Sequence, residues 1–267
     1  MKAFLKWVGG KQRLLSFLCQ KIPLFFKNYH EPMVGGGSLF FELAKRKLIR
    51  KAFLSDANLR LVRTYLGIKK DVEAVISILS GYSYDPDFYV RMRELDPDSL
   101  SDFEVAAWFL YLNRTCYNGL YRVNKKNRFN TPFGKYKNPV ICNGPLLRAC
   151  SEALQNADIF CSSFETVSER TEKGDFVYFD PPYIPLSPSS NFTSYTPSGF
   201  GFEDHVRLRD LSWDLRSQKK VFILLSNSWT ELTLELYGDF QRIPLPVRRA
   251  VSATKEGRKL IHEALIW

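Results

Sequence analysis

The chain has 267 residues, 45% of them hydrophobic, and a formal net charge of +10 at pH 7. This length and apolar content suit one large domain, or one domain that carries an insertion. No uncharged apolar run reaches about 18 residues, and residues 1–7 lack an apolar core, so neither a membrane span nor a signal peptide is expected. The basic excess favours a polyanionic partner such as nucleic acid.

The cysteines and histidines show neither a disulfide pattern nor a metal-binding pattern. The five cysteines are odd in number and scattered, without a Cys-x-x-Cys pair, and the three histidines lie far apart in the sequence. This distribution is typical of reduced thiols in the cytosol rather than of a disulfide framework or a zinc site. We therefore expect a cytoplasmic protein without a metal ion.

The N-terminal segment carries a candidate ligand contact. Residues 4–11 read Phe-Leu-Lys-Trp-Val-Gly-Gly-Lys, and a helix is expected over residues 12–20. The glycine pair allows a ligand to approach the backbone closely. Lys11 could then hold a carboxylate of that ligand while Trp7 covers it. The alternative interpretation is a loop lysine beside a core tryptophan.

A glycine loop and an acidic residue follow in the order of a cofactor-binding α/β unit. A short strand leads into Gly35-Gly36-Gly37, a helix follows, and a second strand over residues 51–55 ends at Asp56. An acid about 20 residues beyond such a loop is the position that binds ribose hydroxyls. The spacing is not Gly-x-Gly-x-x-Gly and no Gly-Lys-Ser/Thr occurs, so neither a dinucleotide nor a nucleoside triphosphate is favoured. Alternatively, Asp56 caps a helix over residues 59–66.

The middle of the chain departs from strand–helix alternation, which indicates an inserted domain. Residues 59–113 read as mainly helical, and residues 105–151 contain no acid, eight Lys or Arg and eight aromatics. Cations interleaved with aromatics are typical of a surface that contacts phosphates and base edges. Tyr117 or Tyr121 could insert into a base stack. Asn118-Gly119 and Phe133-Gly134 are turn signals that predict a β-hairpin or an extended loop.

Alternating helices and strands return after the insert. The expected elements are helices over 146–156 and 203–218 and strands over 157–161, 176–179, 221–227 and 260–267. Between them, residues 184–202 have the Pro-, Ser- and Tyr-rich composition of an active-site loop that moves. Residues 247–253 and 257–259 form further basic patches.

The motif Asp180-Pro181-Pro182-Tyr183 ends the strand over residues 176–179. Neither proline can donate to a sheet ladder, so the strand stops there, at the edge where ligands bind in open α/β sheets. A carboxylate and a proline carbonyl can both accept hydrogen bonds from an NH2 group, and a tyrosine ring can stack on the base that carries it. The alternative for the four residues alone is a simple turn.

Taken in order, these motifs resemble those of the Dam-type DNA adenine-N6 methyltransferases, the D12 class with α-type motif order. The resemblance covers nearly the whole chain. The matching segments are Lys6-Trp7-Val8-Gly9-Gly10-Lys11, Glu31-Pro32-Met33-Val34-Gly35-Gly36-Gly37-Ser38, residues 113–124 with 130–136, and Asp180-Pro181-Pro182-Tyr183 with Phe192-Thr193-Ser194-Tyr195-Thr196.

The resemblance implies an α/β fold: a Rossmann-like S-adenosylmethionine-dependent methyltransferase sheet with an inserted, mainly helical target-recognition domain that carries a β-hairpin. Residues 1–57 and 147–267 would form the catalytic and cofactor-binding domain, and residues 58–146 the DNA-binding domain. The implied donor is S-adenosylmethionine, without a metal. The implied acceptor is N6 of an adenine flipped out of double-stranded DNA, with GATC as the expected sequence, which would associate the protein with the nucleoid.

The resemblance also assigns site residues. Catalysis falls on Asp180, Pro181, Pro182 and Tyr183. The implied cofactor-binding residues are Trp7, Lys11, Gly35, Asp56, Phe164 and Asp180. The implied DNA-binding residues are Lys6, Tyr117, Asn118, Leu120, Arg122, Pro132 and Lys135. Arg122 would read a guanine, Tyr117 would insert into the stack and Lys135 would meet phosphate.

Three positions depart from the family pattern. Met33 replaces the usual Phe, which is a hydrophobic exchange. Residues 226–229 read Ser-Asn-Ser-Trp and lack the His or Asp common after the Ser-Asn pair, which leaves the role of this loop open. Ser162-Ser163 replaces an acid before Phe164, and Ser163 could still cap the cofactor adenine.

Other functions remain open at this point. A cytosine-N4 methyltransferase would use the same amine chemistry, and a non-catalytic DNA-binding module could keep the same scaffold. A nicotinamide-dependent dehydrogenase would explain the glycines and Asp56, but it would not explain the acid-free, aromatic-rich insert.

Overall fold

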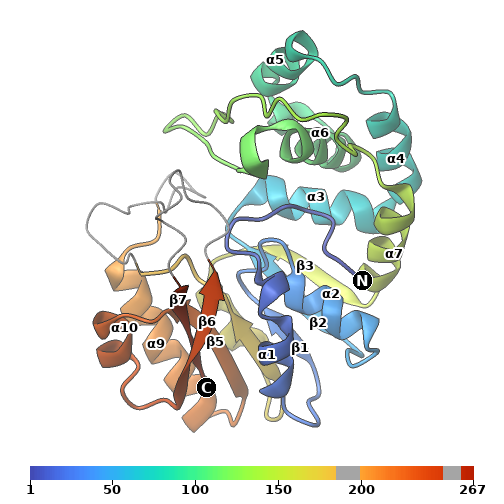
Figure 1. Ribbon diagram of the computed structural model, residues 1–267. Helices are drawn as coiled ribbons and strands as arrows, with labels where there is room; N and C mark the ends of the chain where they lie inside the picture. The colour runs from blue at the N-terminus through green and yellow to red at the C-terminus, as the bar shows by residue number, and fades with distance from the viewer. Residues whose placement is uncertain (185–198, 249–259) are drawn as a thin grey trace.

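The computed structural model describes residues 1–184, 199–248 and 260–267, and within these ranges seven strands form one sheet (Figure 1). The strand order is β3-β2-β1-β4-β5-β7-β6. Strands β1 to β5 pair in parallel, and β7 runs antiparallel to both β5 and β6. The bounds are β1 Tyr29–Glu31, β2 Ala52–Asp56, β3 Ala157–Cys161, β4 Phe176–Phe179, β5 Phe222–Ser228, β6 Arg242–Arg248 and β7 Leu260–Ile266. The predicted α/β fold with a Rossmann-like sheet is confirmed.

Helices cover both faces of this sheet, and β4 shows how the sequence achieves it. All four side chains of β4 are buried, as expected for a strand with both faces covered. Phe176 and Tyr178 pack into one hydrophobic core, whereas Val177 and Phe179 pack into another. Because side chains alternate along a strand, the two cores lie on opposite faces. Helices α1 (Leu15–Gln20) and α2 (Ser38–Lys45) belong to the first face, and α9 (Phe202–Ser217) to the second.

The strand order creates a crevice between β1 and β4. From β1 the chain builds outward through β2 to β3, and it then returns to the other side of β1 with β4. In open α/β sheets such a reversal leaves a gap at the carboxyl ends of the two central strands, and ligands bind there. The residues that follow β1 and β4 are the glycine loop and Asp180, so both predicted motifs meet at this crevice.

A helical layer stands beyond the carboxyl ends of the strands (Figure 1). It comprises α3 Leu59–Lys70, α4 Val72–Ser80, α5 Pro86–Glu94, α6 Asp102–Thr115 and, back toward the sheet, α7 Gly144–Leu154. Helix α6 begins in a capping box between Ser101 and Glu104, and its residues 105–113 are all buried. This corrects one inference from composition: the first part of the acid-free stretch lacks acids because it is core, not because it faces DNA.

Helix α3 joins the two layers. It packs against α6 and α4 in the helical layer and against α7, β2 and β3 on the other side. Its start at Leu59 coincides with the domain boundary expected after residue 57, and that boundary stays a proposal. Asn58 caps α3 by accepting a hydrogen bond from the Leu61 N–H.

Several element ends differ from the sequence-based expectation. The helix expected over 12–20 is a short 3-10 turn, Lys11–Arg13, followed by α1, and α7 begins at Gly144 because Asn143 caps it. The expected hairpin is irregular, with isolated bridges Cys116–Phe133 and Val123–Phe129 instead of regular strands. The remaining elements are 3-10 turns Pro97–Ser99, Tyr117–Gly119 and Phe164–Thr166 and helices α8 Val167–Arg170 and α10 Glu231–Leu236.

Two predicted features fall outside the described residues. These are most of the expected active-site loop, with its motif over residues 192–196, and most of the basic patches over residues 247–253 and 257–259. Across the described ranges, no helix combines the length and the apolar character that crossing a membrane would require.

Candidate active site

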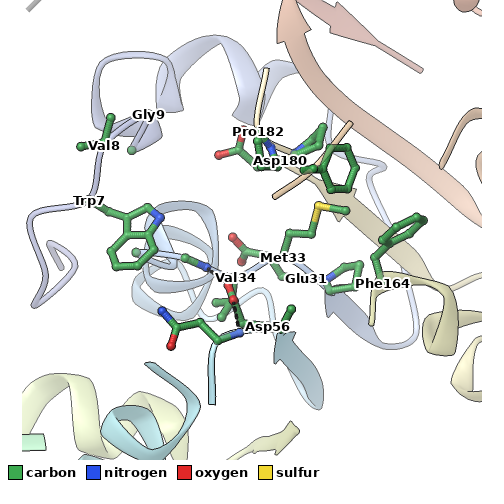
Figure 2. A pocket seen from close by; sticks show the side chains of 18 of the residues that line it. Trp7, Val8, Gly9, Glu31, Met33, Val34, Asp56, Phe164, Asp180 and Pro182 are labelled. Atoms are coloured by element: carbon green, nitrogen blue, oxygen red, sulfur yellow. Dashed lines mark hydrogen bonds between the residues drawn. The ribbon is translucent and has the colours of Figure 1, made fainter. Parts of the chain in front are cut away.

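A pocket of about 1010 Å³ opens at the crevice between β1 and β4 (Figure 2). Its lining comes from the N-terminal segment, the glycine loop after β1, the residues after β2 and the Asp-Pro-Pro-Tyr segment after β4. Segments far apart in the sequence therefore meet at one edge of the sheet. The predicted cofactor and catalytic residues that line it are Trp7, Lys11, Gly35, Asp56, Phe164, Asp180, Pro181, Pro182 and Tyr183.

Asp180 lies immediately after β4 and is paired with a lysine. The Lys11 ammonium is 2.7 Å from the Asp180 carboxylate and 4.7 Å from the centre of the Tyr183 ring. Burial raises the pKa of Asp180 to about 6, with Lys11 opposing the rise and the charge of Glu263 adding to it. At neutral pH this carboxylate is therefore ionised and accepts hydrogen bonds from an N–H donor.

Glu31 is a second acid of the pocket, and it was not among the site residues predicted from the sequence. Its buried carboxylate accepts hydrogen bonds from the Tyr29 hydroxyl at 2.8 Å and the Phe40 N–H at 3.2 Å. Burial raises the pKa of Glu31 to about 8, so the group holds a proton at neutral pH. Figure 2 shows Glu31 and Met33 between Asp180 and Asp56.

The glycine loop carries the indole of Trp7. Gly35 has φ +46°, and a Cβ there would lie 2.5 Å from the indole nitrogen of Trp7. A Cβ on Gly36 would lie 2.8 Å from the Cβ of Trp7. These two glycines thus make room for the tryptophan, in addition to exposing backbone to a ligand. On its other side Trp7 stacks on Tyr121, with ring centres 6.0 Å apart.

Asp56 faces the pocket from the end of β2. Its carboxylate accepts the N–H of Gly35 at 3.0 Å and that of Asn58 at 2.9 Å. It ties the glycine loop to the start of α3, whose cap is Asn58, so the alternative of Asp56 as the cap is wrong. Burial raises the pKa of Asp56, and the backbone hydrogen bonds oppose that rise. Two carboxylate oxygens have about four lone pairs, so the group can accept further hydroxyls.

Phe164 forms the wall opposite Trp7 (Figure 2). The ring is buried and lies 5.8 Å from that of Phe200. The neighbouring Ser163, expected from the sequence to cap an adenine, donates its hydroxyl to Glu165. An acid therefore directly follows Phe164 and accepts a hydrogen bond from the serine that replaces the usual acid.

Side chains of β5 and α9 hold the Asp-Pro-Pro-Tyr segment in place by hydrogen bonds to its backbone and to that of the next residue. Asn227 accepts the Ile184 N–H at 3.1 Å, and the Ser228 hydroxyl donates to the Ile184 carbonyl at 2.7 Å. His205 of α9 is hydrogen-bonded to the backbone of Pro182, and burial lowers the pKa of this histidine to about 4. The sequence marked the Ser-Asn pair without a role, and the structure supplies one, whereas nothing in the sequence pointed to His205.

The two tyrosines offered for insertion into a base stack differ in burial. Tyr117 is 55% exposed, whereas Tyr121 is 4% exposed and stacks on Phe109 with ring centres 4.8 Å apart. Tyr121 is therefore a core residue beneath Trp7, and that interpretation of it was wrong. Only Tyr117 of the two can reach a partner molecule.

The N-terminal segment and the hairpin region lie side by side. Asn113 accepts the Lys6 N–H at 2.9 Å and donates to the carbonyls of Lys6 at 2.7 Å and Gly119 at 3.1 Å. The Lys6 ammonium stands 4.6 Å from the centre of the Tyr136 ring, and burial lowers the pKa of Lys6. Lys6 thus joins the predicted DNA-binding residues although more than 100 positions separate them in sequence.

The remaining predicted DNA-binding residues lie in the same hairpin region. Arg122 is held by Asn130, donating to its side chain at 2.7 Å and to its carbonyl at 3.1 Å. The Pro132 carbonyl accepts the Tyr117 N–H at 2.8 Å. The exposed residues of this group are Asn118, Pro132 and Lys135, and the half-buried ones are Leu120 and Arg122. Within the described ranges, no three His, Cys, Asp or Glu side chains are grouped to hold a metal ion.

The arrangement can hold a planar amine against a second ligand. An ionised carboxylate, two prolines and an aromatic ring line the pocket side by side. A family model described as D12 class N6 adenine-specific DNA methyltransferase matches residues 7–251.

Full-length relatives agree with this family model. The chain is 42% identical to the Type II methyltransferase M1.LlaDCHI of Lactococcus lactis subsp. cremoris, over 100% of this chain and 95% of that protein. It is 38% identical to the Type II methyltransferase M.MjaIII of Methanocaldococcus jannaschii, over 100% of this chain and 98% of that protein. It is 35% identical to the DNA adenine methylase of Escherichia coli K12, over 99% of this chain and 94% of that protein. The chain therefore belongs to the D12 class N6 adenine-specific DNA methyltransferases, and it is an enzyme that methylates adenine in DNA.

Proposed function

We propose that this enzyme takes the methyl group from S-adenosylmethionine and transfers it to N6 of an adenine flipped out of duplex DNA. One observation carries the proposal: an N–H donor, the Lys11 ammonium, stands 2.7 Å from the carboxylate at the end of β4. An exocyclic amine can take the place of that ammonium. The ring of Tyr183 lies next to it and can stack on the base, which offsets the few kcal/mol that flipping costs.

The residues of the pocket fit the proposed cofactor. Asp56 keeps lone pairs beyond its two backbone hydrogen bonds and would accept ribose hydroxyls. Phe164 and Trp7 would enclose the ligand from opposite walls, and the backbone at Gly35 would lie against it. Lys11 would hold the ligand carboxylate once a target amine replaces its ammonium at Asp180. When bound, the sulfonium of S-adenosylmethionine supplies an electrophilic methyl group.

The catalytic segment would orient the acceptor rather than activate it covalently. The N6 amine would donate one hydrogen bond to the Asp180 carboxylate and one to the Pro181 carbonyl. With both N–H bonds fixed, the nitrogen lone pair points out of the base plane toward the cofactor pocket. The amine is itself the nucleophile, so no enzyme-bound intermediate is needed. Positioning and stabilisation of the positive charge developing on nitrogen would be the main contributions.

The hairpin region and Lys6 would form the DNA contact, with residues 58–146 as the target-recognition domain. Tyr117 is exposed and would insert between base pairs, while Arg122 would read a guanine. Lys6 and Lys135 would meet phosphates. We propose GATC as the recognition sequence, and a place in the cytoplasm with the nucleoid follows from a DNA substrate.

The test uses purified full-length protein, labelled S-adenosylmethionine and two duplexes of equal composition, one with GATC and one with the site scrambled to AGTC. The products are digested to nucleosides, and the label is expected in N6-methyl-2′-deoxyadenosine from the GATC duplex alone. Equal labelling of both duplexes would refute GATC as the site. Failure of the protein to bind S-adenosylmethionine in calorimetry would refute the donor.

The variant Asp180→Ala tests the catalytic assignment. It should abolish transfer while the protein stays folded and keeps its affinity for duplex DNA. Asp210→Ala, which removes an exposed acid on α9, is the matched control and should transfer methyl groups normally. Near-normal turnover by Asp180→Ala would overturn the role given to this carboxylate.

A further inference from the structure

Glu263 places a further carboxylate at the wall of the pocket, next to Tyr183. It lies on β7, in register with Ser228 of β5 and Leu245 of β6, and its side chain lines the pocket. Its carboxylate accepts a hydrogen bond from the Tyr183 hydroxyl at 2.5 Å. The ring of Tyr183 is thus tethered at its outer end by an acid that lies 80 positions further along the chain.

Two further observations single out this acid. No cation among the described residues forms an ion pair with Glu263, although it stands in a partly buried position. Its charge also adds to the rise in the pKa of Asp180. Carboxylates that lie close together repel each other, which is unfavourable for folding, and such groups concentrate at functional sites.

We propose that Glu263 is a positioning residue that fixes the ring of Tyr183 in the orientation on which the target base stacks. This inference rests on the proposed function, because it assigns Tyr183 the role of stacking partner. The ring of a tyrosine turns about two side-chain bonds, and a hydrogen bond at the hydroxyl restrains both. A fixed stacking plane sets the place of the N6 amine relative to Asp180, and small displacements of a reacting group cost large factors in rate.

The test compares hydrogen-bonding and non-bonding replacements under single-turnover conditions. Glu263→Leu, which cannot accept the tyrosine hydroxyl, should lower the rate of transfer at least tenfold, while the affinity for S-adenosylmethionine stays unchanged. Glu263→Gln keeps an accepting oxygen without the charge and should recover most of the lost rate. Glu235→Gln, an exposed acid on α10, is the matched control and should leave the rate unchanged.

A double variant shows whether Glu263 acts through the tyrosine. Tyr183→Phe keeps the ring and removes the hydroxyl, so adding Glu263→Leu to it should cause no further loss of rate. A 2-aminopurine at the target position gives an independent signal. Its fluorescence in the complex should rise in Glu263→Leu, because a loose ring stacks less well on the flipped base.

Three results would overturn the inference: losses from Tyr183→Phe and Glu263→Leu that multiply, a Glu263→Gln variant as slow as Glu263→Leu, or a Glu263→Leu variant as fast as the wild type. These are distinguishable from failure of the proposed function. If the wild-type protein transfers methyl groups and Asp180→Ala does not, the proposed function stands and only the role of Glu263 is refuted. If the wild type transfers none, the function itself fails.

Discussion

Asp180→Asn should stabilise the protein while abolishing methyl transfer. The pKa of Asp180 is raised from an ordinary 3.8 to about 6, so at pH 7 the folded protein holds an ionised group that it would prefer to keep protonated. The difference of about two pH units corresponds to about 3 kcal/mol, since a tenfold change in an equilibrium is worth about 1.4 kcal/mol. The side chain is 21% exposed, so we expect a gain of about 2 kcal/mol in the free energy of unfolding.

The predicted gain in stability should depend on pH, because it arises from the ionisation of Asp180. Between pH 3.8 and about 6 the folded state binds more protons at Asp180 than the unfolded state, so this group lowers stability as the pH rises through that window. The gain from Asp180→Asn should therefore be largest at pH 7 and fall to about half at pH 5. This gain already includes the lost pairing with Lys11, because that pairing lowers the pKa of Asp180 and the value of about 6 is what remains after it.

Denaturant unfolding followed by circular dichroism measures the gain directly, and thermal unfolding should show a rise of about 4 to 8 °C at pH 7. Asp210→Asn, on the exposed side of α9, makes the same chemical change and should leave stability within about 0.5 kcal/mol of the wild type. A less stable Asp180→Asn variant, or a gain that does not shrink at pH 5, would refute the reasoning. So would measurable transfer by the variant.

Three further predictions concern the same pocket. The kcat/KM for methyl transfer should fall about tenfold from pH 7 to pH 5 with a midpoint near pH 6, because Asp180 must be ionised to accept the amine; a flat profile contradicts this. Gly35→Ala should lose about 1 to 3 kcal/mol of stability and weaken S-adenosylmethionine binding in calorimetry. Gly81→Ala should do neither, because Gly81 has a negative φ and a Cβ there would make only an ordinary van der Waals contact with the Ile78 carbonyl oxygen at 3.5 Å. Tyr117→Ala should weaken duplex binding by about 1 to 2 kcal/mol and leave the free energy of unfolding unchanged. Tyr121→Ala should lower the free energy of unfolding by about 3 to 5 kcal/mol. Equal unfolding temperatures for the two variants would refute the assignment of Tyr117 to the surface and Tyr121 to the core.

The motif positions could be predicted from sequence because they depend on local chain geometry. A strand must end at Pro181, and a glycine loop must follow a strand end, so the parallel sheet brings both to one edge. The family membership sets aside the cytosine-N4 methyltransferase, the dehydrogenase and the non-catalytic module. Asp56 shows the limit of this reasoning: its place at the end of β2 was predictable, but the cap of α3 belongs to Asn58.

The parts that sequence reasoning missed depend on contacts between distant segments. His205 and Glu263 reach the Asp-Pro-Pro-Tyr segment only because α9 and β7 pack beside β4 and β5, and no local pattern marks them. The acid-free stretch misled for a related reason. Trp108 and Phe109 lie on a helix buried among other helices, so an absence of acids there reflects a core, and composition alone cannot separate a core from a basic surface.

One wall connects the pocket to the hairpin region, which we propose as the cofactor site and the DNA contact. Trp7 lies between the glycine loop and Tyr121, and the Tyr121 hydroxyl is hydrogen-bonded to Asn58 and Arg60 next to the pocket-lining Asp56. Arg60 in turn pairs with Asp98 at 2.8 Å and donates to a backbone carbonyl at the hairpin tip. Protein interiors are close-packed, so we expect a shift of the hairpin to be passed through Arg60 to the ring of Tyr121, which stacks on Trp7. The Asp-Pro-Pro-Tyr segment is held by α9, β5 and β7 and, through the Lys11–Asp180 pair, by the N-terminal segment, so we expect it to move less than the Trp7 wall when the hairpin region shifts.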